Sequence, residues 1–117
     1  MTQDALEDVV RQQAEARVRG DDAWFAAWMT PQALLQLRDA PRGARSMRIA
    51  SASADGDAGV SHVRYTGMCE TYVIEQRWLL ADGAWRCVAA SVRERKLTII
   101  GRIASLFGRA PEAARAT

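Results

Sequence analysis

Residues 76–90 of this 117-residue chain read QRWLLADGAWRCVAA, and this stretch decides the fold. Two runs rich in apolar residues flank Asp82-Gly83. An Asp-Gly pair between such runs predicts a tight β-hairpin, because both central residues of a type I′ turn need a positive φ. The register then pairs inward residues of the two strands: Leu80 with Trp85, Trp78 with Cys87, and Gln76 with Ala89. The hairpin therefore has an apolar inner face that the rest of the chain must cover.

The size and composition are those of one globular domain. The chain is 49% hydrophobic and 26% charged, which is enough to build a core without cross-links. Its net charge is only +2, and the positive excess lies in residues 92–117. Residues 1–91 show no basic patch of the kind that nucleic acid requires. We therefore expect no nucleic-acid partner.

The two cysteines predict a reducing compartment. Cys69 falls at a turn and Cys87 lies in the middle of a strand, too far apart for a disulfide, whose Cα atoms must come within about 7 Å. No apolar leader follows Met1, and no run approaches the roughly 18 apolar residues of a membrane span. We expect a cytoplasmic protein.

Apolar residues at helical spacing predict three helices ahead of the hairpin, over residues 3–19, 22–29 and 31–39. Gly20 ends the first helix. An aspartate caps the second, and Thr30-Pro31 begins the third, since Thr is a good cap and Pro fits the first helical turn.

From Ser46 the apolar period changes to two, which predicts strands over residues 46–54 and 59–67. A turn centred at Cys69-Glu70 leads into the hairpin and sets three inward pairs and one outward pair: Tyr65 with Ile74, Val63 with Gln76, Ser61 with Trp78, and Arg64 with Glu75. The inward parity of strand 46–54 stays open. Helices followed by antiparallel strands define an α+β domain with about four strands.

Two stretches resemble the NTF2-like superfamily, which includes SnoaL-like cyclases and ketosteroid isomerases. Residues 18–31 (VRGDDAWFAAWMTP) are similar to its helix–Gly-Asp–helix–Pro opening, and residues 77–88 to its closing hairpin. The resemblance implies an NTF2-like, cystatin-like cone over residues 1–95, with three helices packed on a curved sheet. The segment 31–45 is shorter than in the superfamily, which implies a smaller pocket. These motifs mark a fold and no particular activity.

The candidate ligand-binding residues are the polar and aromatic groups expected inside the cone: Trp28, Ser61, Tyr65, Tyr72, Gln76 and Trp78. They either fill the core or line a pocket for a small apolar ligand. An isomerase needs an acidic base there, and no inward carboxylate is expected. We therefore predict no catalytic residue and favour a non-enzymatic binding module for a small apolar ligand or a protein partner.

The alternative is a cofactor-free isomerase or cyclase of the SnoaL-like type, with Tyr65 or Tyr72 as an oxyanion donor. An aspartate at position 21, 22 or 39 that reached a cavity near Tyr65 would favour it. His62 is the only histidine and is expected to face outward, so we expect no metal site. We expect no cofactor either.

Residues 96–109 form a separate amphipathic segment, either a helix or an extension of the last strand, and residues 110–117 a frayed tail. As a helix, Leu97–Phe107 carries a broad apolar arc behind three basic residues. Such a helix packs on its own domain or on a dimer mate, or contacts a partner's groove or an anionic membrane surface. The mixed outer face of the sheet adds the expectation of a homodimer.

Overall fold

The structure is a computed structural model, and it describes residues 2–107. Three helices come first: α1 (Thr2–Arg19), α2 (Asp22–Ala27) and α3 (Pro31–Gln36). The rest of the chain forms strands β1 (Ser46–Asp55), β2 (Ala58–Thr66), β3 (Glu70–Ala81) and β4 (Ala84–Leu97), then α4 (Ile99–Phe107). The order of helices and strands is the one that the sequence predicts.

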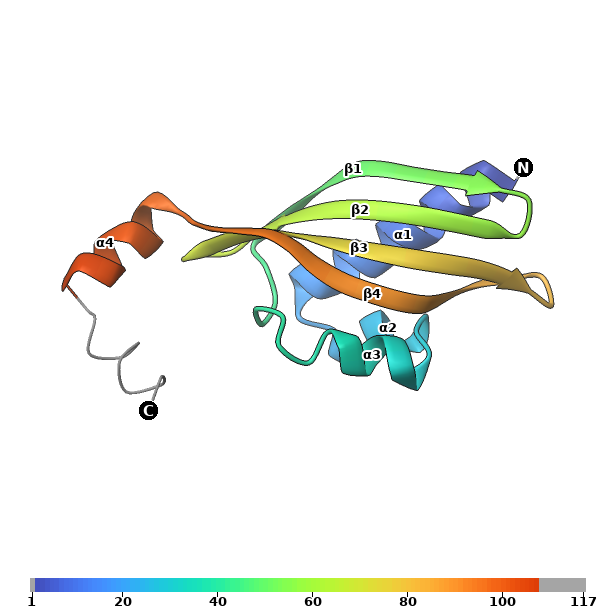
Figure 1. Cartoon of the computed structure of the whole chain (residues 1–117), viewed down its shortest axis with the longest axis horizontal. Coiled ribbons are helices and arrows are strands. Elements are labelled where there is room, and N and C mark those ends of the chain that lie inside the picture. Colours follow the sequence, from blue (N-terminus) through green and yellow to red (C-terminus); the bar gives the residue numbers. More distant parts are fainter. Residues whose placement is uncertain (1, 108–117) are drawn as a thin grey trace.

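The four strands form one antiparallel sheet in the order β1-β2-β3-β4. Helices α1, α2 and α3 lie together on one face of this sheet, and no helix among residues 2–107 covers the opposite face (Figure 1). The architecture is the predicted α+β arrangement, with the core between the helices and the inner face of the sheet.

Capping hydrogen bonds fix where the two short helices, α2 and α3, begin. The Asp21 carboxylate accepts a hydrogen bond from the Trp24 amide at 3.1 Å and caps α2. The Thr30 hydroxyl accepts one from the Ala33 amide at 3.2 Å and caps α3, with Pro31 in its first turn. These caps satisfy amides that have no partner inside the helix.

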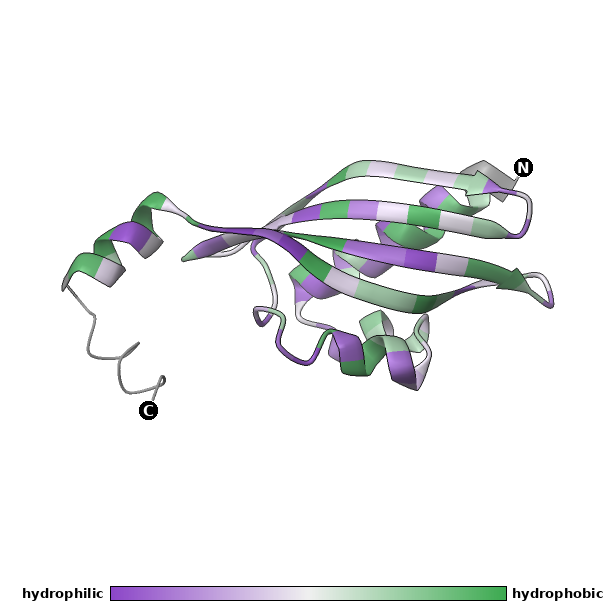
Figure 2. Ribbon diagram, viewed as in Figure 1, coloured by the Kyte–Doolittle hydropathy of each residue, from purple (hydrophilic) through white to green (hydrophobic). Residues whose placement is uncertain are grey.

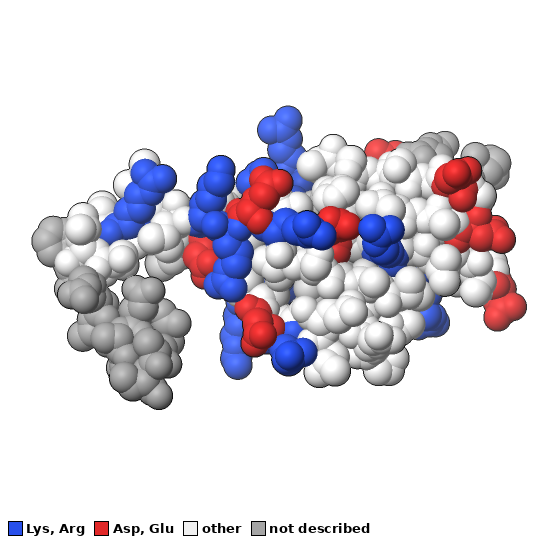
Figure 3. Space-filling model, in the orientation of Figure 1, with Lys and Arg blue, Asp and Glu red and all other residues white. Residues whose placement is uncertain are grey.

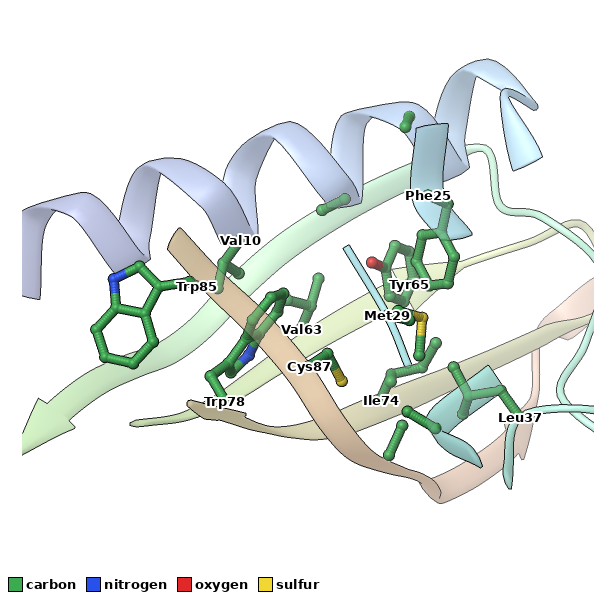
Figure 4. Close-up of a cluster of buried hydrophobic side chains, with 14 of the residues drawn as sticks. Val10, Phe25, Met29, Leu37, Val63, Tyr65, Ile74, Trp78, Trp85 and Cys87 are labelled. Atoms are coloured by element: carbon green, nitrogen blue, oxygen red, sulfur yellow. The ribbon is translucent and has the colours of Figure 1, made fainter. Parts of the chain in front are cut away.

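The core is the predicted inner face of the sheet, packed under the helices. The close-up view shows aromatic and aliphatic side chains from the strands meeting those of the helices (Figure 4). Trp78 is 1% exposed, and Tyr65, Ile74 and Cys87 are fully buried. The helices contribute Leu6, Val10 and Phe25, and the residues that follow α2 and α3 add Met29 and Leu37.

The hairpin at Asp82-Gly83 is confirmed for two of its three predicted pairs. Both turn residues have a positive φ, and Leu80 faces Trp85 while Trp78 faces Cys87. The third pair is wrong, because an extra residue in β4 shifts the register and Gln76 faces Ala90. The cause is tertiary: the amide and carbonyl of Cys87 bond to Trp28 and Thr30, on the far side of β4.

The predicted register between β2 and β3 is also wrong, because the observed pairing is shifted by an even number of residues. Tyr65 faces Tyr72, and Arg64 faces Val73 rather than Glu75. The turn closes earlier than expected, through a hydrogen bond from the Gly67 amide to the Glu70 carbonyl. Because side chains alternate along a strand, an even step leaves every residue on its predicted face.

The parity of β1, which the sequence left open, is set by a bulge between Ile49 and Ser51. Met47 and Ile49 pack on the core before the bulge, and Ala52 and Ala54 after it. A bulge adds one residue to one strand, so the inward positions change from one parity to the other.

At one end the sheet continues as an arm, which we define as residues 67–71 and 93–107. Its strands pair Glu70 with Leu97 and Thr71 with Lys96, and α4 follows directly. Figure 1 shows α4 at the far end of this arm, away from α1–α3. β4 therefore passes the predicted domain limit at residue 95, and within the predicted segment 96–109 the described residues, 96–107, form the end of a strand and then a helix. The predicted tail, 110–117, lies outside the described residues.

Candidate functional site

The predicted ligand-binding residues other than Trp28 are buried in the core, where the structure divides them among separate contacts. Trp78 Nε1 donates a hydrogen bond to Ser61 Oγ at 2.9 Å, and Gln76 Nε2 to Cys87 Sγ at 3.3 Å. Tyr65 stacks on Tyr72 with ring centroids 5.5 Å apart. All these side chains are buried, so the interior is filled. Their role in binding a ligand stays a prediction.

Trp28, the sixth predicted residue, lies apart from the others on the helix side of the core. It is half-buried at the end of α2, and its ring meets the edge of Trp24 with centroids 5.7 Å apart. Its backbone carbonyl accepts a hydrogen bond from the Cys87 amide, so Trp28 borders the same edge of β4 that carries the bulge.

Several buried polar atoms have no hydrogen-bond partner among the described residues: Trp28 Nε1, Tyr65 Oη, Gln76 Oε1 and Trp85 Nε1. Most buried polar side-chain atoms in proteins are paired, so these four atoms are exceptions. Each such atom left bare lowers stability by about 1–3 kcal/mol.

The sequence analysis missed a buried cation. Arg17, on α1, is only 9% exposed. Its Nε donates to the Tyr72 hydroxyl at 2.9 Å and its Nη2 to the Pro41 carbonyl, while Tyr72 itself donates to the Gly43 carbonyl. Its guanidinium also lies over three aromatic rings, with the carbon 5.0, 5.4 and 5.6 Å from the centroids of Phe25, Tyr65 and Tyr72.

A signal for Arg17 was present in the sequence. Leu6, Val10, Gln13 and Arg17 recur at steps of three and four, which places them on one side of a helix. The periodicity was clear, but an arginine is normally assigned to the solvent side of such a helix. Here its stem and its guanidinium pack under the aromatic side chains instead.

Burial changes the acidity of the groups around this site. It raises the pKa of Tyr65 and that of Tyr72, although the nearby Arg17 charge opposes both shifts. Burial also raises the pKa of the Cys87 thiol, against the hydrogen bond from Gln76. Both phenols and the thiol are therefore held in their neutral forms, and a neutral thiol is a weak nucleophile.

The buried polar side chains in the described part of the chain are Gln13, Arg17, Ser61 and Gln76, and none is a carboxylate. Asp22 lines a surface cleft beside Arg17, and Tyr65 is not among the residues that line it. His62 faces outward, with Nδ1 3.0 Å from Ser51 Oγ and Nε2 3.5 Å from Glu75 Oε1. Residues 2–107 contain no cluster of His, Cys, Asp and Glu that could hold a metal.

A different kind of site lies on α4, which is held firmly at its first turn. Thr98 Oγ1 accepts a hydrogen bond from the Gly101 amide at 3.0 Å and donates one to the Met68 carbonyl at 2.6 Å. The Thr98 amide donates to the Cys69 carbonyl at 2.9 Å. Gly101 is buried against that same carbonyl, where an added Cβ would lie only 2.0 Å from its oxygen. The β2–β3 turn therefore fixes where α4 begins.

The rest of α4 is apolar and uncovered. Ile99, Ile100, Ile103 and Leu106 are 50–76% exposed. Figure 2 shows these hydrophobic positions on the helix beyond the sheet. Of the alternatives predicted for this segment, packing on its own domain is wrong, because the arm carries α4 away from the helices that cover the core.

No protein-family model matches this chain, and no curated protein matches it. Two solved structures do. An NTF2-like protein of unknown function from Shewanella baltica OS155 superposes with a TM-score of 0.62 at 14% identity, and one from Silicibacter pomeroyi DSS-3 with 0.58 at 20%. Each match covers 80% of this chain and 93% of the other. The fold is NTF2-like. Identities this low show the fold alone.

The NTF2-like sheet has an outer face that no helix among residues 2–107 covers. Near the β1–β2 turn this face holds a groove of about 350 Å³, lined mostly by small and apolar residues that include Val60, Leu79 and Val88. Because of the bulge in β4, Ala90 lies on the inner face, where the predicted register placed its neighbour Ala89.

Charge on the outer face is divided between its ends. Figure 3 shows basic side chains across the middle and toward the arm, and acidic ones at the end that carries the tight turns. Asp55, Asp57 and Asp82 lie at those turns, whereas Arg64, Arg93 and Arg95 lie toward the arm. The two ends of the sheet thus have opposite charge, apart from the glutamates that pair with the arginines. No described helix is long and apolar enough to cross a membrane.

Proposed function

We propose that this NTF2-like protein is a non-enzymatic binding module that acts through protein–protein contact, and that α4 carries the contact surface. One observation carries the proposal: the start of α4 is held by hydrogen bonds and close packing, while its apolar side chains are left in solvent. Contiguous exposed apolar patches are uncommon on soluble monomers and mark sites of interaction. A helix that is held in place and still uncovered has the properties of a binding element.

The occupant that we propose is a second copy of the chain. The outer sheet face offers an apolar groove beside Leu79, and its two ends differ in charge. In an antiparallel two-fold pair, the basic arm of one copy would face the acidic turns of the other. The same surface would then supply both the helix and the groove, as an isologous interface requires.

The interior gives less support to the small apolar ligand predicted from the sequence. Ser61, Tyr65, Tyr72 and Gln76 are fully buried, so such a ligand would have to displace packed side chains. The isomerase or cyclase alternative gains no observation in its favour, since the interior of the described chain offers no carboxylate as a base. Both cysteines are free, which is in keeping with the cytoplasm as the proposed compartment.

The test is sedimentation velocity at micromolar concentration on three proteins. The wild-type chain should sediment as a dimer. Ile100→Asp/Ile103→Asp puts two charges on the exposed side of α4 and should sediment as a monomer with an unchanged melting temperature. Leu35→Asp, at an exposed position of α3, is the matched control and should remain a dimer.

Two results would reject the proposed occupant. One is a wild-type monomer at micromolar concentration at both low and high salt. The other is a double variant that still dimerises. If the wild-type monomer instead co-sediments with vesicles containing anionic lipid, and the double variant does not, α4 binds a membrane surface rather than a second copy.

A further inference from the structure

We propose that the cleft between the end of α1, the end of α3 and the loop at residues 40–43 binds a small organic carboxylate. Arg17, Arg38 and Arg42 line this cleft together with Leu37 and Pro41, and its volume is about 440 Å³. That volume lies within the range of small-molecule sites in proteins. The site is separate from α4 and from the outer sheet face, so it stands apart from the proposed dimer.

The first argument is the state of Arg17. A buried charge is costly unless it is paired, and proteins normally pair a buried arginine with a carboxylate. No carboxylate in the described part of the chain lies within ion-pair distance of Arg17. Its contacts are a hydroxyl, a carbonyl and the faces of aromatic rings, all of them neutral. The guanidinium borders the cleft with its charge uncompensated by an acidic side chain.

The second argument is that two further arginines border the same cleft. Arg38 and Arg42 are exposed, and neither forms an ion pair with a described carboxylate. Arg38 Nη1 donates one hydrogen bond, to the Leu35 carbonyl at 3.0 Å, and the other N–H groups of its guanidinium remain for a ligand. Asp22 is the acidic residue among the lining residues, so three positive groups face one negative group. The cleft therefore attracts anions.

The third argument selects an organic carboxylate over an inorganic anion. A guanidinium fork matches the two oxygens of a carboxylate. Leu37, Ala40 and Pro41 give the same cleft an apolar wall, against which the hydrocarbon part of such a ligand can pack. Inorganic phosphate would use the charges and leave this wall unused.

The loop that forms the wall is itself held by the buried arginine. Arg17 bonds to the Pro41 carbonyl, and Tyr72, its other hydrogen-bond partner, bonds to the Gly43 carbonyl. The guanidinium and the wall are therefore fixed relative to each other before any ligand arrives. Such preorganisation reduces the entropy lost on binding.

The experiment titrates the full chain with three probes: hexanoate, hexanol as its neutral match, and inorganic phosphate. The readout is the NMR signal of the Arg17 Nε–H group, because Arg17 lines the cleft and this group donates to the Tyr72 hydroxyl. Hexanoate should shift this signal saturably, whereas hexanol should not. Affinity for hexanoate should fall about fivefold in Arg38→Gln/Arg42→Gln, as expected for the loss of two exposed charges. The matched control is Arg86→Gln, at an exposed position of β4, and should bind as the wild type does.

Arg38 and Arg42 are exposed, so their double variant should fold and keep the test decisive even if changes at Arg17 unfold the chain. Arg17→Lys keeps a charge but loses the fork, and it should bind hexanoate more weakly than the wild type. Each of the following would overturn the proposal: no saturable shift with hexanoate, equal binding of hexanol, equal affinity in Arg38→Gln/Arg42→Gln, or phosphate binding as tightly as hexanoate.

Discussion

The arm continues β3 and β4 beyond the rest of the described chain, which we call the body. The body and the arm are held together in different ways. In the body, the inner side chains of β3 and β4, such as Ile74 and Trp78, are buried under three helices. In the arm, the same strands continue with Leu97 about half exposed, and α4 follows with most of its apolar side chains in solvent. Apolar burial stabilises the first region, whereas polar contacts position the second.

The polar contacts of the arm are specific. Arg95 forms a two-pronged ion pair with Glu70, at 2.9 and 3.1 Å, and Arg64 pairs with Glu94 at 3.0 Å. Exposed pairs of this kind contribute little free energy each. They can nevertheless fix the direction of a strand pair. Changes in the body should therefore alter stability, whereas changes in the arm should alter what the protein binds.

The strongest test of this division is Trp78→Ala. Trp78 is buried at the centre of the body and its indole bonds to Ser61, so truncation leaves a cavity and an unpaired hydroxyl. We expect a loss of about 3–5 kcal/mol in the free energy of unfolding, measured by denaturant melts.

An exposed leucine of the body provides the control for this prediction. Leu35, on α3, is 59% exposed, so Leu35→Ala should cost less than about 1 kcal/mol in the same melts. A cost below about 1 kcal/mol for Trp78→Ala would mean that the body is not held by its core.

The parts of the fold that the sequence predicts correctly depend on local chemistry. The turn at Asp82-Gly83 needs only a positive φ at two successive residues, which these residue types supply. The caps at Asp21 and Thr30 act within one helical turn. The faces of β2 and β3 follow from a period of two, so they were correct even though the register between these two strands was wrong.

The errors arise where distant segments decide the outcome. The bulge in β4 depends on Cys87 bonding to Trp28 and Thr30, which lie far away in the sequence. The candidate site shows the same limit. The sequence places Arg17 on the same side of α1 as Leu6 and Val10. Its burial beside the cleft, however, depends on hydrogen bonds to Tyr72 and to the Pro41 carbonyl. The direction of α4 depends on the turn at Met68 and Cys69.

A smaller effect, still within the body, separates the two stacked tyrosines. The Tyr72 hydroxyl accepts from Arg17 and donates to Gly43, so Tyr72→Phe should lower the free energy of unfolding by about 1–3 kcal/mol. The Tyr65 hydroxyl is buried with no partner among the described residues. Tyr65→Phe removes a group that gains nothing in the folded state, and it should be neutral or stabilising by up to about 1 kcal/mol.

Both substitutions keep the stacked rings, so the pair of variants isolates the hydroxyl groups. Denaturant melts at neutral pH measure the difference. Equal losses in the two variants would show that Tyr65 Oη has a partner as good as that of Tyr72, such as an internal water molecule.

The smallest effect on stability, and the one confined to the arm, is expected for Gly101→Ala. Alanine is the better helix former by about 1 kcal/mol, so propensity alone would strengthen α4. Its Cβ, however, would collide with the Cys69 carbonyl, which accepts the Thr98 amide. We expect the collision to dominate and to release the start of α4 from the turn. Amide exchange at Thr98 should then speed up severalfold, as expected for the loss of one hydrogen bond worth about 1 kcal/mol. The free energy of unfolding of the body should change by less than about 0.5 kcal/mol.

Arg102→Ala, at the next and exposed position, should leave Thr98 exchange as it is. Slower exchange at Thr98 in Gly101→Ala would show that helix propensity, rather than docking on the turn, fixes α4.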